Sequence, residues 1–478
     1  MTLHKNFIAG EWVGSDDVNA DINPSNLADT VGEYARADQA QTAAAITAAH
    51  AAFPAWSRSG VQARANLLEA IGNEIAARKD ELGRLLSREE GKTLPEGIGE
   101  VVRASQIFKF FAGEAVRLGG EKLPSVRPGL EVEITREPLG VVGIVTPWNF
   151  PIAIPAWKIA PALCYGNTVV FKPADLVPGC AWALADIIAR AGMPEGVFNL
   201  VIGRGSVVGE AILNDPRIAG VSFTGSVETG RTVAQKAVKR LAKVQLEMGG
   251  KNPLVVLDDA DLDVAVNCAV QGAYYSTGQR CTASSRLIVT EKIHGAFVER
   301  MTQALTKLRV DDALKEGTDI GPVVDETQLK QDLDYLEIGQ SEGAELACGG
   351  ERLNRSAEGY YLAPALLVGT HNGMRVNREE IFGPVATVLK VGGYDEALAT
   401  ANDTAFGLSS GICTTSLKAA SDFKRNSEAG MVMVNLPTAG VDYHVPFGGR
   451  KGSSYGPREQ GSYAKEFFTT VKTAYVAP

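Results

Sequence analysis

Cys281 is the residue of this sequence whose surroundings best suit a reactive thiol. It ends the segment GQRC (278–281) and is followed by a threonine and, shortly after, two serines. A glycine-flanked loop that leads into a β-branched run can display a thiol, and the attacking thiolate forms where dipoles or cations lower the pKa of the cysteine. The other five cysteines lie in apolar or featureless segments, where cysteine is most often a small buried hydrophobe; they are Cys164, Cys180, Cys268, Cys348 and Cys413.

Two further segments carry groups that could act on the same carbonyl carbon. In LEMGGKNP (246–253), Glu247 lies between apolar residues just before a Gly-Gly turn, where a carboxylate could be a general base for water. The alternative is a helix-terminal glutamate in a salt bridge. In TPWNFP (146–151), Asn149 carries two amide donors on a proline-stiffened loop and could hold an oxyanion. The alternative is a plain asparagine turn.

A glycine-bearing segment, FTGSVETG (223–230), predicts a strand that runs into a turn and then a helix over 231–243. The N-terminus of a helix favours phosphate through its free N–H groups and its dipole. The glycines, Gly225 and Gly230, have the spacing GxxxxG and not GxGxxG, so a simple βα turn is an equally good interpretation.

The elements that must position these groups follow from the apolar pattern. Residues 38–118 have helical spacing, whereas from Val141 short β-branched runs alternate with helix-length segments, which predicts a doubly wound parallel sheet. A second strand–helix series after Cys281 predicts a second α/β domain. Residues 119–137 alternate like an exposed hairpin and 467–476 form a terminal strand, so both could be edges that pair with another subunit. The runs of the first series are 141–145, 168–171, 197–202, 221–223 and 253–257.

Two more features concern the first sheet. FKPAD (171–175) ends a strand and places Lys172 and Asp175 at the carboxyl edge, where doubly wound folds bind ligands. Asp175 would repel a 2′-phosphate and favour NAD over NADP, whereas Lys172 would attract that phosphate and favour NADP.

The uncharged stretch 138–157 is long enough to cross a bilayer, but its four prolines predict a buried strand followed by a loop.

Composition narrows the class of protein. At about 150 residues per domain, 478 residues correspond to roughly three domains. With 45% hydrophobic and 22% charged residues the chain is globular, and its net charge of −9 argues against nucleic-acid and membrane partners. Scattered cysteines and an N-terminus without an apolar or basic leader predict a cytoplasmic location. Five histidines without metal-type spacing predict no metal site.

Seven segments taken together resemble the NAD(P)-dependent aldehyde dehydrogenase superfamily over nearly the whole chain. They are TPWNFP, FKPAD, FTGSVETG, LEMGGKNP, GQRC, EEIFGPV and PFGGRKGSSYG, in that order. Within the superfamily the sequence is most similar to the α-ketoglutaric semialdehyde (2,5-dioxopentanoate) dehydrogenases, through VNLPTAGVDYHVPFGGRKGSSYGPREQG and GQRCTASSR.

The resemblance implies a fold, an assembly and a set of roles. The implied α/β fold has a doubly wound parallel-sheet NAD-binding domain (1–118 and 138–249), an α/β catalytic domain (250–460) and a β oligomerisation arm (119–137 and 461–478), in a homodimer or homotetramer. Cys281 is the implied nucleophile, Glu247 the general base and Asn149 the oxyanion donor. The candidate cofactor contacts, for NAD or alternatively NADP, are Pro147, Trp148, Lys172, Asp175, Gly225, Ser226, Gly230, Glu380 and Phe382.

These residue types suit the implied reaction step by step. Attack of the thiolate on an aldehyde gives an oxyanion, for which a preorganised donor such as Asn149 is worth about 3–4 kcal/mol. Loss of hydride leaves a thioester, and water needs a base such as Glu247 to hydrolyse it. Members of the superfamily that transfer the acyl group to coenzyme A lack this glutamate, so its presence predicts a free acid as the product.

Four residues are candidates for substrate binding. We hypothesise that Arg280, Lys158 or both bind the distal carboxylate of an ω-oxo acid, with structural ion pairs as the alternative. Phe447 and Tyr443 would wall the substrate tunnel, with a place in the core as the alternative. The expected reaction converts 2,5-dioxopentanoate to 2-oxoglutarate; succinate or glutarate semialdehyde, or a broad range of aldehydes, is the alternative.

Two other classes of protein compete with this interpretation. A cysteine hydrolase would pair Cys281 with a histidine, but none of the five histidines lies in a recognisable Cys–His context. A catalytically silent binding protein on the same scaffold is the second, because a fold does not fix a function. The joint presence of Cys281, Glu247 and Asn149 argues against it.

Overall fold

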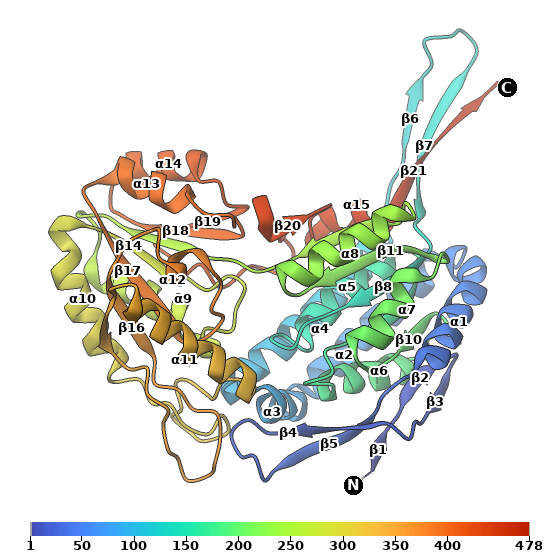
Figure 1. The fold of residues 1–478 in the computed structure, drawn as a ribbon. Helices are drawn as coiled ribbons and strands as arrows, with labels where there is room; N and C mark the ends of the chain where they lie inside the picture. Colours follow the sequence, from blue (N-terminus) through green and yellow to red (C-terminus); the bar gives the residue numbers. More distant parts are fainter. Residues whose placement is uncertain (1, 478) are drawn as a thin grey trace.

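The structure is a computed structural model that describes residues 2–477. Its two largest sheets have eight and seven strands, and each is the centre of one half of the molecule (Figure 1). A three-stranded sheet lies near the N-terminus and another forms an arm that projects from the body. Between residues 2 and 477 there is no helix of the length and apolar character needed to cross a bilayer.

The helices predicted for 38–118 are confirmed. They are α1 (Gln39–Ser57), α2 (Val61–Ala77), α3 (Lys79–Glu90) and α4 (Leu94–Ala115). Helix α4 begins with a reciprocal capping box between Thr93 and Glu96, which satisfies free N–H groups of its first turn. Five strands that we did not predict precede the helices, because runs of two to six residues are too short to show an alternating pattern. They are β1 (Leu3–His4), β2 (Asn6–Ile8), β3 (Glu11–Val13), β4 (Val18–Ile22) and β5 (Thr30–Ala35).

The eight-stranded sheet has the order β20-β12-β11-β8-β9-β10-β2-β3, and its five central strands are parallel, as predicted. Residues of β8 alternate between its two faces: Val142 and Ile144 pack with α2, α4, α5 and α6, whereas Val141 packs with α1 and α8. Helices therefore cover both faces, as parallel sheets require. The elements are β8 (Val141–Val145), α5 (Ala153–Cys164), β9 (Thr168–Lys172), α6 (Gly179–Arg190), β10 (Phe198–Leu200), η1 (Gly205–Gly209), α7 (Glu210–Asn214), β11 (Ile218–Thr224), α8 (Val227–Lys239), β12 (Lys243–Glu247) and β20 (Ser454–Tyr455).

Three details of this region differ from the predictions. The stretch 138–157 contains β8 and a loop, but its last residues begin the fully buried helix α5. Pro155 is tolerated there because the first turn of a helix leaves N–H groups without partners in any case. Helix α8 begins at Val227, four residues earlier than predicted, because Ser226 caps it. The run at 253–257, which we grouped with the first series, belongs to the second sheet.

The seven-stranded sheet has the order β15-β16-β17-β14-β13-β18-β19 and is parallel except at the β15 edge. It confirms the predicted second α/β series. Its strands are β13 (Pro253–Val256), β14 (Arg286–Thr290), β15 (Glu345–Cys348), β16 (Ala365–Thr370), β17 (Val385–Val391), β18 (Ser409–Cys413) and β19 (Met431–Val434). Its helices are α9 (Leu262–Ala273), η2 (Tyr275–Gly278), α10 (Glu291–Leu305), α11 (Glu326–Ser341), α12 (Arg375–Arg378), α13 (Tyr394–Asn402) and α14 (Leu417–Asn426).

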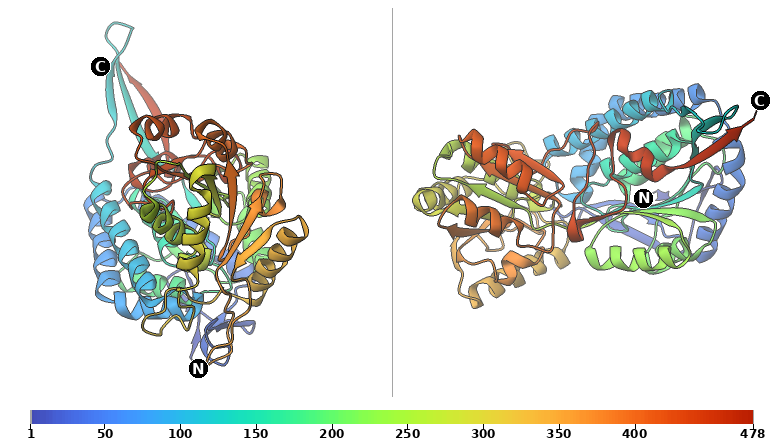
Figure 2. Two further views of the ribbon diagram at one scale, coloured as in Figure 1. Left: turned by 90° about the vertical axis from the view of Figure 1, so that its left-hand side faces the viewer. Right: turned by 90° about the horizontal axis from the view of Figure 1, so that it is seen from above.

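The arm combines the predicted hairpin with the predicted terminal strand. Strands β6 (Glu121–Pro124) and β7 (Glu131–Pro138) form the hairpin, and β21 (Thr469–Val476) pairs with β7 along its whole length. Figure 2 shows the arm leaving the half that contains the eight-stranded sheet. Just before it, the chain forms η3 (Lys451–Ser453), η4 (Gly461–Ala464) and α15 (Lys465–Phe468). The division of the chain into three domains stays a prediction.

Candidate active site

Cys281 lies in a turn that joins η2 to β14. The backbone of η2 is left-handed at Ser276 (φ 52°) and Thr277 (φ 57°), a conformation that is costly for residues other than glycine. Hydrogen bonds from the side chains hold it: Ser276 Oγ donates to Glu96 Oε1 over 2.9 Å, and Thr277 Oγ1 donates to the Gly321 carbonyl over 3.2 Å. The turn that precedes Cys281 is thus held in place by hydrogen bonds to Glu96 and Gly321.

The carbonyl side of Cys281 is also anchored. Asn252, at the start of the second sheet, donates through Nδ2 to the carbonyl oxygens of Cys281 (2.7 Å) and Ala283 (2.9 Å). Gly250 approaches so closely that a Cβ atom there would lie 2.6 Å from the Cys281 oxygen. A side chain at position 250 would push the cysteine out of place.

Cys281 lines two cavities, which share no other described residue. The first has a volume of about 280 Å³ and is lined by Lys92, Glu96, Gly99, Glu100, Arg103, Phe150, Trp157, Ser276, Arg280, Cys281, Thr282, Ala439, Gly440, Val441 and Phe447. The second, of about 260 Å³, is lined by Pro147, Trp148, Asn149, Ile154, Thr224, Gly225, Ser226, Met248, Gly249, Cys281, Gln328, Gln331, Glu380 and Phe382. A carbon held at the sulfur is therefore reachable from two sides. We call the first the acyl cavity and the second the dinucleotide cavity.

The resting cysteine is a thiol. Burial, helped by the negative charges of Glu380 and Glu247, raises the pKa of Cys281 to about 12. The neighbouring cation, Arg280, does not offset this shift, because its guanidinium is turned to Glu96. The thiol must therefore give its proton to a base when it attacks.

Glu247 ends β12 and is only 3% exposed. Its Oε2 accepts a hydrogen bond from Ser454 Oγ on β20, the strand that pairs with β12. Burial, and after it the charge of Glu459, raises the pKa of Glu247 above its ordinary value. A carboxylate with a raised pKa is a stronger base than an exposed one, which suits a general base.

Lys158 is not among the residues that line either cavity. It is completely buried on α5, donates to Ser222 Oγ over 2.9 Å and forms an ion pair with Glu459. We correct the hypothesis that Lys158 binds the substrate: the structural ion pair, which was the alternative, is what the structure contains. Its charge partly offsets the effect of Glu459 on the pKa of Glu247.

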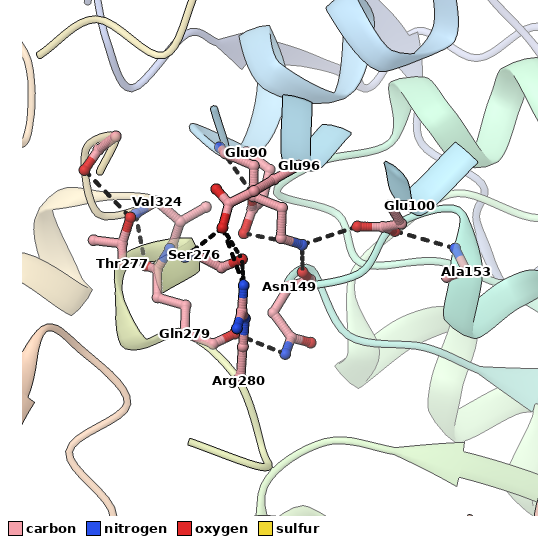
Figure 3. Close-up of polar contacts among 12 residues, drawn as sticks. Glu90, Glu96, Glu100, Asn149, Ala153, Ser276, Thr277, Gln279, Arg280 and Val324 are labelled. Atoms are coloured by element: carbon pink, nitrogen blue, oxygen red, sulfur yellow. Dashed lines mark hydrogen bonds and ion pairs between the residues drawn. The ribbon is translucent and has the colours of Figure 1, made fainter. Parts of the chain in front are cut away.

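Asn149 lies in the loop between β8 and α5 and is 3% exposed. Its Nδ2 donates to the Gln279 carbonyl over 3.0 Å, so one of its two amide hydrogens is bound to the cysteine loop (Figure 3). Glu100 fixes the end of the same loop by accepting from the backbone N–H groups of Ile152 and Ala153, each over 3.1 Å. The structure thus brings Asn149 to the dinucleotide cavity beside Cys281.

Arg280 lines the acyl cavity, but its guanidinium is already engaged. Nη2 lies 3.0 Å from Glu96 Oε1 and donates to Ser276 Oγ over 2.7 Å, and Figure 3 shows the side chain directed at these two residues. Glu96 is 184 residues away from Arg280 in the sequence. Arg280 therefore fixes the cysteine turn, and its fork is not free for a ligand.

The dinucleotide cavity contains most of the predicted cofactor contacts. Gly225 and Ser226 lie at the start of α8, where Ser226 caps the helix by accepting from the Thr229 N–H. Trp148 and Phe382 meet edge to face at 5.4 Å between ring centroids. Pro147 also lines this cavity. Helix N–H groups suit a pyrophosphate and the aromatic pair suits a flat ring, so the residues present fit a nicotinamide dinucleotide.

Glu380 supplies the carboxylate of this cavity. It accepts from the Gly250 N–H over 2.7 Å, and burial raises its pKa to about 7. Gly249 passes so closely that a Cβ atom there would lie 2.0 Å from Glu380 Oε2. The two glycines thus allow the carboxylate to approach the backbone, which leaves its second oxygen for a ligand hydroxyl.

Three of the candidate cofactor residues are not among those that line the cavity. A Cβ atom at Gly230 would lie 2.3 Å from Met248 Sδ, so this glycine lets α8 pack on the sheet. Lys172 is buried at the end of β9, and burial lowers its pKa to about 8. Asp175 pairs with Arg36 over 2.8 Å. Arg36, which we did not consider, offsets the negative charge that would repel a 2′-phosphate.

The two aromatic candidates for substrate binding, Phe447 and Tyr443, lie in different parts of the structure. Phe447 lines the acyl cavity and stacks on Trp157 at 5.5 Å between ring centroids. Tyr443 is not in the lining; it packs edge to face against Phe110 at 6.2 Å, which is the core role given as its alternative. Sequence reasoning missed the acyl-cavity residues of α4 because charged residues on an amphipathic helix are usually solvent-facing.

The structure also bears on the competing classes. No histidine lines either cavity at Cys281, so the described residues offer no partner for a cysteine hydrolase. Residues 2–477 contain no group of three or more histidine, cysteine, aspartate or glutamate side chains that could hold a metal ion. Asn149 lines the dinucleotide cavity together with Cys281, whereas Glu247 lines neither cavity and acts on the thiol through its charge, which helps to raise the pKa of Cys281.

Comparison with known proteins decides the family. The profile of the aldehyde dehydrogenase family matches residues 12–474. The chain belongs to this family. An α-ketoglutaric semialdehyde dehydrogenase of Bacillus subtilis is 44% identical over 100% of this chain and 99% of the relative, and a 2,5-dioxopentanoate dehydrogenase of Saccharolobus solfataricus is 41% identical over 98% of each. The resemblance found in the motifs is thus confirmed.

A solved structure confirms the fold class. The betaine aldehyde dehydrogenase of Staphylococcus aureus in complex with NAD⁺ superposes with a TM-score of 0.97 at 32% identity, over 99% of this chain and 95% of that one. The protein studied here is an NAD(P)-dependent aldehyde dehydrogenase with the fold of that family.

Proposed function

We propose that this enzyme oxidises 2,5-dioxopentanoate to 2-oxoglutarate with NAD in the cytoplasm, with a thiohemiacetal and a thioester on Cys281 as intermediates. The observation that carries the chemistry is the position of Cys281, the residue shared by a cavity rich in cationic side chains and a cavity suited to a dinucleotide. Two relatives that match nearly the whole chain bear the name of this activity.

In the first half-reaction the Cys281 sulfur forms a bond to the aldehyde carbon. Its proton goes to Glu247, whose raised pKa makes the carboxylate a stronger base than an exposed one. The aldehyde oxygen becomes an oxyanion at the second amide hydrogen of Asn149 and the Cys281 N–H. When bound, NAD accepts the hydride that leaves the carbon as the C=O bond re-forms, which produces the thioester.

In the second half-reaction the thioester is hydrolysed. Glu247 first releases to solvent the proton that it took from the thiol. It then takes a proton from water as the hydroxyl oxygen forms a bond to the acyl carbon. The C–S bond then breaks, the acid leaves, and the sulfur regains a proton. Ser454 holds the carboxylate of Glu247 in place during both steps through its hydrogen bond.

The acyl cavity supports an ω-oxo acid as the substrate class, because its cations Lys92, Arg103 and Arg280 outnumber its two carboxylates, Glu96 and Glu100. The test is a set of initial rates with 2,5-dioxopentanoate, succinic semialdehyde, glutaraldehyde and betaine aldehyde, each with NAD and with NADP. We expect the highest kcat/KM for 2,5-dioxopentanoate with NAD. A higher value for succinic semialdehyde would move the assignment to that acid, and a higher value for betaine aldehyde would contradict the class.

The same proposal includes a homodimer or homotetramer assembled through the arm. Strands β6, β7 and β21 extend away from the body and expose apolar side chains to solvent, which a monomer would have no use for. These are Leu123, Val126, Val471, Tyr475 and Val476. Light scattering should give a dimeric or tetrameric mass for the intact chain and a monomeric mass after Val471→Lys with Tyr475→Lys; a monomeric intact chain would contradict this part.

A further inference from the structure

The three cations that line the acyl cavity differ in their partners. Lys92 lies 2.9 Å from Glu100 Oε2, and Arg280 lies 3.0 Å from Glu96 Oε1. Arg103 forms no ion pair with any residue in the range 2–477. The carboxylates of α4 that face this cavity are thus already neutralised by the other two cations.

Arg103 lies on α4, three residues after Glu100. Its Nη2 donates to Gln460 Oε1 over 3.1 Å, and its guanidinium carbon lies 5.6 Å from the centroid of the Trp157 ring. Its Nε is buried and has no hydrogen-bond acceptor. The guanidinium is therefore held in position by a neutral amide and an aromatic face, with donor capacity left over.

The charges of Glu100 and Asp442 favour the cation, but neither residue forms an ion pair with Arg103, so an anion in the cavity would complete its environment. Burial lowers the pKa of Arg103, although an arginine side chain stays protonated in proteins. A buried charge without a counter-ion is costly, as is a buried N–H without an acceptor. An arginine fork recognises a carboxylate through two parallel hydrogen bonds. Arg103 lines the acyl cavity, and its remaining Nη hydrogens can donate to a carboxylate there.

We propose that Arg103 binds the distal carboxylate of the ω-oxo acid substrate and thereby selects this class of aldehyde. This inference rests on the proposed function, because it names the group that recognises its substrate. Trp157 and Phe447, stacked on each other in the same cavity, would flank the carbon chain. With the carboxylate at Arg103, the other end of the substrate points along the cavity toward Cys281, which lines the same space.

The test compares Arg103→Met with the unchanged enzyme on two five-carbon aldehydes, 2,5-dioxopentanoate and pentanal, of which only the first has a carboxylate. For 2,5-dioxopentanoate we expect kcat/KM to fall by roughly 10- to 100-fold, mainly through KM, because a charge-assisted hydrogen bond is lost. For pentanal we expect a change of less than about threefold. Lys109→Met is the matched control, since it removes an exposed cation from the same helix.

The outcomes separate this inference from the function on which it rests. An unchanged enzyme that oxidises pentanal as well as 2,5-dioxopentanoate would overturn the substrate class, and the role of Arg103 with it. A clear preference for 2,5-dioxopentanoate that Arg103→Met leaves intact would overturn the role of Arg103 alone. Equal losses on both aldehydes would also overturn it, because they indicate a structural role.

A second variant keeps the inference testable if Arg103→Met does not fold. Arg103→Lys retains the charge but not the fork, so kcat/KM for 2,5-dioxopentanoate should fall by a smaller factor than in Arg103→Met. Glutarate, a dicarboxylate without an aldehyde, should inhibit pentanal oxidation competitively, and its inhibition constant should rise by roughly tenfold in Arg103→Lys. An unchanged inhibition constant would contradict the proposal.

Discussion

The two cavities that meet at Cys281 are built from different kinds of group. The dinucleotide cavity is made of strand-end turns, backbone N–H groups and an aromatic pair, with Glu380 as its buried carboxylate. The acyl cavity is lined by one face of α4, by Trp157 of α5 and by loop residues, and its wall combines three cations with two carboxylates. The first kind of site recognises a ligand largely through the backbone, whereas the second recognises it through side-chain charge. Cofactor and substrate specificity can therefore change separately in this fold.

Removal of the sulfur should have the largest effect, because it breaks the one point that both cavities share. In Cys281→Ser we expect kcat to fall by on the order of 10⁴-fold or more, since an alcohol is a far weaker nucleophile than a thiolate. NAD binding, followed by fluorescence quenching, should be retained, because the dinucleotide cavity is otherwise intact. Substantial residual oxidation would show that the acyl and dinucleotide cavities do not meet at this atom.

Glu247→Gln should have the next largest effect. We expect steady-state turnover to fall by roughly 10²- to 10⁴-fold, because water finds no base for hydrolysis of the thioester; the thiol can still lose its proton to solvent, so acylation slows less. Because the base must be ionised, the raised pKa of Glu247 also predicts that turnover in the unchanged enzyme rises with pH as this group loses its proton. Ser454→Ala, which removes one hydrogen bond to the carboxylate, is the control and should cost about fivefold. Equal rates in Glu247→Gln and the unchanged enzyme would remove Glu247 from both steps.

Asn149→Ala tests the wall of the dinucleotide cavity beside the thiol. We expect kcat to fall by roughly 10²- to 10³-fold, the usual effect of losing one oxyanion donor. The KM for NAD should stay within about twofold, because a lost interaction of the transition state leaves ground-state binding unchanged. A loss that appears only in the KM for NAD would show that Asn149 serves the cofactor and not the oxyanion.

The smallest effect concerns the charge state of the thiol in the enzyme without ligands. With a pKa of about 12, Cys281 is a thiol at neutral pH, and only the thiolate reacts with iodoacetamide. The rate of alkylation, measured by mass spectrometry of the Cys281 peptide, should therefore rise about tenfold per pH unit between about pH 7 and 9. A rate that is already constant at pH 7 would indicate a thiolate stabilised by a cation, which the carboxylates around the thiol do not provide.

The difference between the cavities also explains what the sequence could predict. Turns that follow strands have local signatures, so the segments of Asn149, Ser226 and Glu247 could be found from their own residues. The two sheet series and the hairpin of the arm were equally local and are confirmed. The strands β1 to β5 were missed because each is too short for its pattern to be distinguished from a loop.

The acyl cavity could not be predicted in the same way, because its charges are settled by partners distant in the sequence. Arg280 in the cavity pairs with Glu96, 184 residues earlier, and Lys158, which lies outside the cavity, pairs with Glu459, 301 residues later. No local sequence pattern shows which of the cations keeps N–H donors that are free to bind a ligand. Arg103 looks like an ordinary charge on an amphipathic helix until the packing of α4 against α5 places it in the cavity.

The most direct test of the account is to trap the covalent intermediate in Glu247→Gln. The enzyme is mixed with 2,5-dioxopentanoate, with and without NAD, quenched in acid and analysed by intact mass and peptide mapping. We predict an acyl group on the peptide that contains Cys281, formed only when NAD is present, because the thioester forms by hydride loss and then waits for a base. No adduct, or an adduct on another cysteine, would contradict the central claim that Cys281 carries the acyl group between the two cavities.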